Sequence, residues 1–301
     1  MLEFQNISIY KKKNTIVDNL TLSVPDGAVL GLLGEDRKGK SAILEAAAGC
    51  RMVNKGQILL DGTPVFARET QSCRKIGYMP GAYGFYQLLK VEEYYELILS
   101  LYKIRGRDQR KRLDEVLAFV ELEKYRDTFI GEMPAECYPF LYLGQVILPE
   151  PEWLLLDEPF GTMDSAARRD MARMLQLLFE GGTSIIINAP MYQEIMDFVT
   201  DIAVMEEGKL MVYGPVEEVY AKALLEAPVR MQVLSRMETA LEVLKQNHLV
   251  DRVTVDGDEV IFRFNGGERE EARLLSELVT SGVLIRNYMR DQADMESMFR
   301  R

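Results

Sequence analysis

The sequence predicts an α/β core built on a mixed sheet, with a helical subdomain near residues 82–150 and a small α+β domain after the core. Three observations lead to this prediction. Short β-type runs alternate with turn signals over the first sixty residues, an apolar run enters a helix through a glycine-flanked loop, and the tail alternates strands and helices. We expect one domain at 1–222 and a second at 228–301, which suits a chain of 301 residues.

The N-terminal part predicts several strands and one helix. Period-two or β-branched runs, broken by the turn signals "PDG" and "DG", predict strands in "EFQNISIY", "TIVDNLTLSV" and "GQILLDGTPV". The run "AVLGLLG" is continuous and apolar, which is typical of a strand buried on both faces. It ends at Gly34, and "SAILEAAAGC" then predicts a helix closed by Gly49.

The tail from about Pro228 predicts a separate small domain. Its runs are "VRMQVL", "METALEVLKQNH", "DRVTVDGDEVIFRF", "GEREEARLLSELVTSG" and "VLIRNYMR". They predict the order βαββαβ, which suggests a ferredoxin-like unit. A dimerisation or packing appendage is the alternative, and periodicity does not separate the two. His248, the only histidine, lies at a helix end in this tail, and we expect it to be structural.

Composition excludes several classes of function. Hydrophobic residues make up 48% of the chain and charged residues 28%, as in ordinary globular proteins. The net charge of −11 leaves no basic excess to neutralise phosphates, so no nucleic acid is expected as a partner. No apolar run approaches the ~18 residues of a spanning helix, and the N-terminus lacks a signal-peptide pattern, which predicts a cytoplasmic protein. Cys50, Cys73 and Cys137 are too scattered for a zinc site and too few for a disulfide framework.

The loop from Gly34 to Ser41 carries the pattern GxxxxGK[ST] between the predicted strand and helix. Backbone N–H groups of such a loop and helix start point at an anion, and the expected binding positions are Gly34, Lys38, Gly39 and Ala42. Lys40 would reach the β- and γ-phosphates of a nucleotide, and the Ser41 hydroxyl would complete Mg²⁺ coordination. A tight β–α turn with a chance lysine is the alternative. The bulky "EDRK" is unusual in a place where small residues would wrap a phosphate more easily.

A second constellation lies in "PEWLLLDEPFGTMD", where apolar residues 153–156 directly precede Asp157 and Glu158. A buried strand that ends in two carboxylates presents Asp157 to a metal-bound water and Glu158 to the attacking water of a phosphoryl transfer. A strand with a solvated acidic end is the alternative, which the upstream loop disfavours. Asp157 is therefore a candidate metal ligand and Glu158 a candidate catalytic residue.

With these motifs the chain resembles the ATP-binding subunits of ABC transporters over roughly residues 1–220. "GEDRKGKS" resembles the family's Walker A loop, "WLLLDEP" its Walker B strand with the catalytic glutamate, and "GTMD" its D-loop. Tyr10 stands where the family stacks an aromatic ring on adenine, and a simple strand-end tyrosine is the equal alternative. The resemblance implies a P-loop NTPase core of the ABC type, with ATP and Mg²⁺ as cofactors.

Partners and location are implied by the same resemblance. It implies a membrane-spanning permease subunit and a second ATP-binding subunit, either the same chain or a different one, at the inner face of the cell membrane. The final "DQADMESMF" resembles the segment that ends many subunits of the drug- and antibiotic-export type. The basic run "KIRGRDQRKR" has two interpretations, a solvated helix face or linker and a contact with acidic lipid headgroups.

Three motifs of the family are missing from their expected positions. The signature LSGGQ, whose serine and glycines bind the ATP of the opposite subunit, is replaced by "MPAEC". There Pro134 has no N–H to donate, and Glu136 would bring a carboxylate near a triphosphate. The Q-loop position holds Gly81, and Gln87 is expected on a helix surface. The switch histidine is absent after "TSIIIN", where "APM" follows.

Two functions of different class remain open. In the first, the chain is a working ATPase that drives export through a membrane partner. In the second, it is an ATP-binding subunit with poor hydrolysis that stabilises or regulates such a complex. The retained Glu158 favours the first, and the missing motifs favour the second. A nucleotide kinase is disfavoured because "LLLDEPFGTMD" has no place in one.

Overall fold

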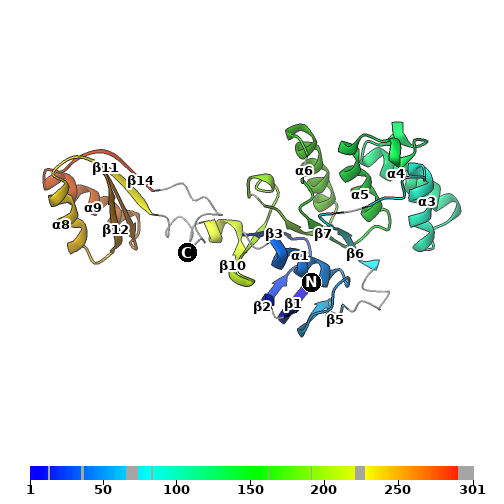
Figure 1. Cartoon of the computed structure of the whole chain (residues 1–301), viewed down its shortest axis with the longest axis horizontal. Helices are drawn as coiled ribbons and strands as arrows, with labels where there is room; N and C mark the ends of the chain where they lie inside the picture. The colour runs from blue at the N-terminus through cyan, green and yellow to red at the C-terminus, as the bar shows by residue number, and fades with distance from the viewer. Residues whose placement is uncertain are drawn as a thin grey trace. The chain divides into compact units, whose positions relative to one another are not determined.

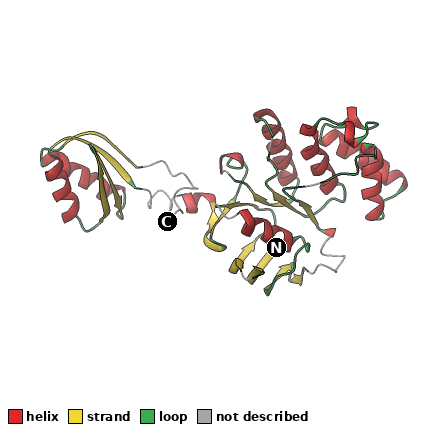
Figure 2. Ribbon diagram, viewed as in Figure 1, coloured by secondary structure: helices red, strands yellow, loops and turns green. Residues whose placement is uncertain are grey.

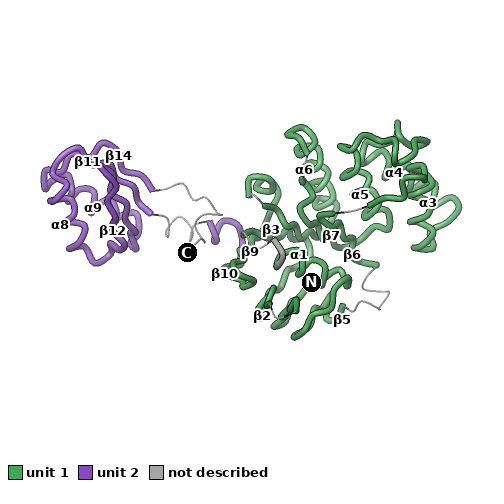
Figure 3. Tube along the Cα trace, viewed as in Figure 1, with its two compact units in different colours: residues 1–214 green, residues 215–301 purple. Residues whose placement is uncertain are grey.

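The computed structural model divides the chain into two compact units, residues 1–214 and residues 215–301, and each is described by itself (Figure 3). The structure describes residues 1–12, 14–34, 37–65, 74–82, 84–161, 163–190, 192–220 and 228–290, apart from the side chains at 37 and 38. The final stretch "DQADMESMF" lies outside the described residues. Among the described helices, none has both the length and the apolar character needed to cross a membrane.

A four-stranded antiparallel sheet opens the first unit. Its strands are β1 (Leu2–Lys11), β2 (Asn14–Val24), β4 (Lys55–Leu60) and β5 (Thr63–Pro64). Their order is β2-β1-β4-β5, and each neighbouring pair is antiparallel. The strands predicted from period-two patterns are therefore confirmed, with apolar side chains buried in a core on one face.

A six-stranded sheet forms the centre of this unit. Its strands are β3 (Val29–Leu33), β6 (Ile76–Met79), β7 (Trp153–Asp157), β8 (Ser184–Asn188), β9 (Asp201–Glu206) and β10 (Lys209–Pro215). The order is β10-β9-β3-β8-β7-β6, and the five strands from β9 to β6 are parallel. Every residue of β3, β7 and β8 is buried. This confirms the prediction that "AVLGLLG" forms a strand covered on both faces and that the strand before Asp157 is buried.

The helix α1 (Arg37–Ala47) lies between the two sheets, and α6 (Ser165–Glu180) lies on the opposite side of the six-stranded sheet (Figure 1). One apolar core joins α1 to both sheets, with Phe4 from β1, Ile43 from α1 and Leu155 from β7 among its members. The predicted mixed sheet thus takes the form of two sheets around one helix. Because parallel strands end at a common edge, the loops that follow β3, β6, β7 and β8 meet there.

A group of helices follows β6 (Figure 1), and Figure 2 draws these helices in red. It comprises α3 (Val91–Leu101), α4 (Gly106–Phe119) and α5 (Tyr138–Ile147), with the 3-10 turns η1 (Glu123–Tyr125), η2 (Ile130–Glu132) and η3 (Ala135–Cys137). Helices α3 and α5 touch at Gly144, where a Cβ would overlap the hydroxyl of Tyr95. Arg112, in the basic run, donates from Nη2 to the carbonyl oxygen of Ile147 at 2.7 Å and caps α5. This residue of the run is therefore structural.

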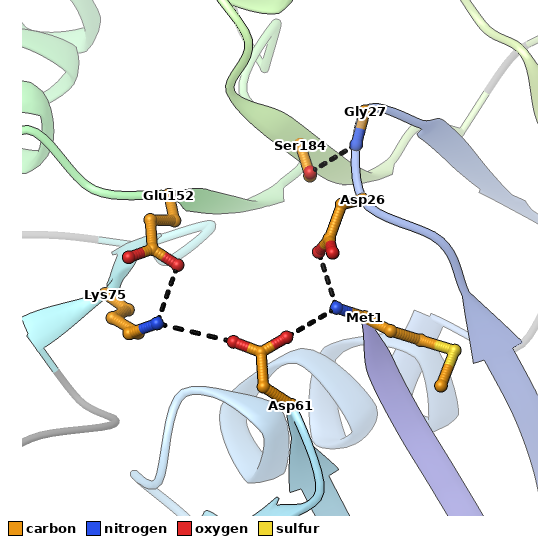
Figure 4. Close-up of polar contacts among 7 residues, drawn as sticks. All are labelled: Met1, Asp26, Gly27, Asp61, Lys75, Glu152 and Ser184. Atoms are coloured by element: carbon orange, nitrogen blue, oxygen red, sulfur yellow. Dashed lines mark hydrogen bonds and ion pairs between the residues drawn. The ribbon is translucent and has the colours of Figure 1, made fainter.

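An ion network joins the starts of several strands at the edge away from those loops (Figure 4). The Met1 ammonium lies 2.5 Å from Asp26 and 2.7 Å from Asp61, and Lys75 Nζ lies 3.3 Å from Asp61 and 2.9 Å from Glu152. Burial lowers the pKa of the Met1 ammonium, but its hydrogen bonds to the two aspartates outweigh burial and leave that pKa raised. The hydrogen bond from the ammonium likewise lowers the pKa of Asp61. These partners are largely exposed, so their contribution to stability is small.

The second unit carries another four-stranded sheet. Its elements are β11 (Val229–Ser235), α8 (Met237–Gln246), β12 (Val250–Asp256), β13 (Glu259–Phe264), α9 (Glu268–Thr280) and β14 (Leu284–Arg290). The strand order is β12-β13-β11-β14, and all three neighbouring pairs are antiparallel. Apolar side chains from the sheet and both helices form one core. The βαββαβ order predicted for the tail is confirmed.

Candidate nucleotide-binding site

The GxxxxGK[ST] loop lies between β3 and α1, as predicted. Gly34 directly follows β3 and has a φ of +113°, a conformation that residues with a side chain rarely adopt. A Cβ at this position would overlap the backbone carbonyl oxygen of Met205 in β9. Glu35, Asp36 and the side chain of Lys38 lie outside the described part of the structure. Glycine is therefore required at 34 both for its φ and for the close approach of β9.

The start of α1 presents polar groups to the mouth of this loop. Gly39 lies in the first turn, whose N–H groups point out of the helix end, whereas Ala42 lies one turn further on. Lys40 is 1% exposed, and its Nζ donates to the carbonyl oxygen of Gly34. Ser41 is half-buried beside it. A buried ammonium favours an anionic partner, so this arrangement suits a phosphate.

The two predicted carboxylates follow β7, and β8 adds a third polar group beside them. Asp157 is 6% exposed and Asn188 is fully buried, and the two are register partners. Asn188 Nδ2 donates to Asp157 Oδ1 at 2.5 Å, and the backbone N–H of Glu158 donates to the Asn188 carbonyl oxygen at 2.9 Å. Glu158 has a φ of +50°. This left-handed backbone conformation costs of order 1–3 kcal/mol in a residue with a side chain, and it is kept only where the surrounding structure holds it. Sequence reasoning did not name Asn188 as a site residue.

The Q-loop position lies against the same carboxylate. A Cβ added at Gly81 would lie 3.3 Å from the carbonyl oxygen of Asp157 and 3.6 Å from its Oδ2. Burial and then the charge of Asp157 raise the pKa of the Tyr78 hydroxyl in the neighbouring strand β6. The fold therefore brings position 81 to the metal-site candidate, but glycine offers no side-chain ligand.

Ser41 in the first turns of α1 and Asp157 at the end of β7 carry oxygen atoms of the kind that Mg²⁺ takes as ligands. The described residues contain no group of three or more His, Cys, Asp or Glu side chains that would hold a metal by themselves. Magnesium does not need such a cage, because it is commonly held by one or two carboxylates together with substrate phosphates and water. When bound, it would neutralise charge on the phosphates.

The predicted adenine-stacking residue lies in β1. The backbone N–H of Tyr10 donates to Asn54 Oδ1 at 2.7 Å, which fixes the strand end. Lys55 Nζ lies 5.9 Å from the centroid of the Tyr10 ring, within reach of a cation–π contact. Both interpretations of Tyr10 therefore stay open.

The "MPAEC" stretch lies at the start of α5. Pro134 precedes η3, and Pro139 is the second residue of α5, so two backbone positions here have no N–H. Glu132 and Glu136 are both exposed at this helix start. This stretch thus has two backbone positions without a donor and carries exposed carboxylates.

An ion pair that sequence reasoning missed fixes the loop after Glu158. Arg168 in α6 donates from Nη1 to Glu194 Oε1 at 2.5 Å and from Nε to the carbonyl oxygen of Met163 at 3.0 Å. Glu194 ends η4 (Tyr192–Glu194), the turn after β8. Asp164, in the D-loop-like stretch, caps α6 by accepting from the next turn. No local spacing signals the Arg168–Glu194 pair, because its members belong to different elements.

Two further sequence predictions concern Gln87 and His248. Gln87 is exposed in a turn before α3, so the prediction of a helix-surface position is wrong. The helix starts only after Lys90, whose backbone N–H donates to Glu93 Oε2 at 2.9 Å. His248 lies in the second unit, between α8 and β12.

The fold and the loop define the class of protein: a P-loop nucleotide-binding domain. The model of the ABC transporter family matches residues 17–161. A probable sulfate/thiosulfate import ATP-binding protein of Chlorella vulgaris is 29% identical over 71% of this chain and 91% of its own length. A Synechocystis import protein for sulfate/thiosulfate is 28% identical over 68% of this chain but 58% of its own length. By these matches the chain is similar to the ATP-binding subunits of ABC transporters.

A third relative extends over the second unit. The linearmycin resistance ATP-binding protein of Bacillus subtilis is 25% identical over 99% of this chain and 97% of its own length. Among solved structures, an ATP-binding subunit of an ABC transporter aligns with a TM-score of 0.67 and 19% identity over 74% of this chain and 92% of its own. A dimeric ATP-binding cassette bound to ADP and Pi aligns with a TM-score of 0.64 and 19% identity over 72% and 99%. These structures support the fold.

Proposed function

We propose that the chain binds Mg-ATP as a subunit of an export complex and couples that binding to a membrane-spanning permease at the inner face of the cell membrane. The carrying observation is that the phosphate loop, Lys40, Asp157 and Glu158 meet at the carboxyl edge of one parallel sheet. In this proposal Ser41 and Asp157 hold the magnesium ion, Tyr10 stacks on adenine and Glu158 polarises the attacking water.

The relatives include import proteins and a resistance protein, so the direction of transport is part of this proposal. The import proteins align with 68% and 71% of the chain, whereas the linearmycin resistance protein aligns with 99% of it. That longer alignment includes residues 228–301, which we propose to be a ferredoxin-like domain because of their βαββαβ order and fully antiparallel sheet. A shared tail is the support for an export role.

A second candidate is a hydrolysis-deficient subunit that regulates or stabilises such a complex. It is favoured by Gly81, which brings no side chain to Asp157, and by the acidic, proline-containing start of α5. Both candidates require ATP binding and a second ATP-binding subunit. The two candidate functions differ in the rate of ATP hydrolysis that each predicts.

Substitution of Lys40 by alanine is expected to weaken Mg-ATP binding at least about tenfold, because a charge-assisted bond to phosphate is worth roughly 1.5–3 kcal/mol. Isothermal calorimetry of wild type and variant measures the change. Lys209→Ala is the matched control, since that lysine is exposed and lies 3.8 Å from Asp18. No heat from wild type with millimolar ATP would contradict the proposed binding.

Homodimerisation driven by ATP is expected to be weak even in a Glu158→Gln variant. Each nucleotide of a homodimer would face Pro134 and Glu136 of the other copy. Pro134 has no backbone N–H to donate to the phosphates, and the carboxylate of Glu136 would repel them. Light scattering with and without ATP makes the measurement. A stable dimer that forms on addition of ATP refutes this expectation.

A further inference from the structure

We propose that Asn188 is a positioning residue of the metal site. Its amide N–H groups orient Asp157, and its amide oxygen accepts a hydrogen bond from a water that the cation carries when Mg-ATP is bound. The inference rests on the proposed Mg-ATP binding and adds to it a residue on a strand that carries neither of the two nucleotide motifs.

The first observation is an unsatisfied acceptor. Asn188 is 0% exposed, and while Nδ2 donates to Asp157 Oδ1 at 2.5 Å, Oδ1 of Asn188 has no hydrogen-bond partner among the described residues. A buried amide oxygen without a partner is costly, and such atoms in folded proteins commonly meet an ion or an ordered water. The hydrogen bond to Asp157 therefore satisfies the amide nitrogen of Asn188 but not its amide oxygen.

The second observation is where the side chain lies. Strand β8 runs between β3, which leads into the phosphate loop, and β7, which ends at Asp157. Asn188 is the register partner of both Leu32 and Asp157, and register partners share a face of the sheet. Leu32 belongs to the core packed against α1. Asn188 therefore lies on the face that α1 covers, together with the carboxylate proposed to hold the metal.

The chemistry of the two amide atoms matches this place. The hydrogen bond from Asn188 Nδ2 to Asp157 Oδ1 orients this carboxylate, and its other oxygen, Oδ2, lies on the side of Gly81, a residue without a side chain. Water bound to a cation is a hydrogen-bond donor, and a neutral amide oxygen is an acceptor that adds no charge to the site. Groups that hold a metal ligand from behind in this way commonly change metal affinity by 10- to 100-fold when removed.

The test compares the affinity for ATP with and without metal. Calorimetry gives the Kd of ATP in excess Mg²⁺ and in excess EDTA, and the ratio of the two isolates the metal-dependent gain. We expect Asn188→Leu to reduce this gain about tenfold or more, with the metal-free Kd unchanged within error. Asn188→Val is the second variant, because valine suits a β-strand if leucine prevents folding. Electron spin resonance of Mn²⁺ with ATP gives an independent readout, in which the variants should bind fewer ions.

Ser184→Ala is the matched control on the same strand. Ser184 is also buried, and its Oγ accepts from the Gly27 N–H at 2.8 Å at the opposite end of β8 (Figure 4). This variant should lose stability and keep the full metal-dependent gain. An unchanged gain in both Asn188 variants, or an equal loss in Ser184→Ala, overturns the inference. Absence of ATP binding by wild type would instead overturn the proposed function beneath it.

Discussion

Phosphate release by the purified protein at saturating Mg-ATP is expected to be slower than about 1 s⁻¹, near the low end of ordinary enzymes. The resemblance to the family implies three groups that the sequence does not have at the expected positions: a glutamine at 81, a histidine after β8 and signature donors from the opposite subunit. Removal of one transition-state donor typically costs about 10²–10³ in rate. Because losses within one cooperating site do not add, we expect a deficit of at least about 10², not the product.

The blank for this measurement is Glu158→Gln, which removes the proposed water-polarising carboxylate and leaves the loop unchanged. If wild type turns over at about 1 s⁻¹ or faster and the variant does not, the candidate function of a hydrolysis-deficient subunit is wrong. Gly81→Gln serves as the repair variant. The space at position 81 admits a Cβ 3.3 Å from the Asp157 carbonyl oxygen with small adjustment, so we expect its turnover to rise about tenfold or more.

A complete partner subunit is expected to repair this site only in part. It would supply signature donors to the phosphate loop of this chain, whereas the missing glutamine and histidine act within the chain itself. The partner's own nucleotide would face the start of α5 with Pro134 and Glu136. Both sites of a heterodimer therefore remain impaired, and the retained Glu158 is the residue that argues for residual hydrolysis.

The second large effect is expected from Gly34→Ala. The new Cβ would overlap the carbonyl oxygen of Met205, at a φ of +113° that alanine rarely adopts. Backbone strain and overpacking each cost roughly 1–3 kcal/mol, so we expect a loss of about 3 kcal/mol or more in the free energy of unfolding. The displaced loop should also lose most of its affinity for ATP.

Gly62→Ala is the control for this substitution. Gly62 also has a positive φ, +72°, but a Cβ there meets nothing within 4 Å, so only the backbone strain of about 1–2 kcal/mol applies. The single tryptophan, Trp153, is buried in β7, and its fluorescence reports urea unfolding of the first unit alone. Equal midpoints for the two variants would contradict the proposed clash with β9.

Local pattern was enough to predict most elements of both units. The apolar run that became β3 indicated burial on both faces because no polar alternation interrupts it, and the run that became β7 indicated a buried strand; every residue in both is buried. The period-two runs, bounded by the "DG" turn signals, indicated the strands that form the antiparallel sheets, because alternating residues point to opposite faces of a strand. Gln87 was misplaced because the start of α3 depends on the Lys90–Glu93 cap, which a helical period does not fix.

By itself the sequence determined the phosphate-loop pattern, the paired carboxylates after a buried strand and the strands that carry them, because each depends on neighbours along the chain. Tertiary structure alone decided which distant residues share the site. Asn188 and Gly81 meet Asp157 only because β8 and β6 flank β7 in parallel register, and Arg168 meets Glu194 only because α6 packs beside the turn after β8. Strand order and register arise from the packing of whole elements, which the period of a single strand does not encode.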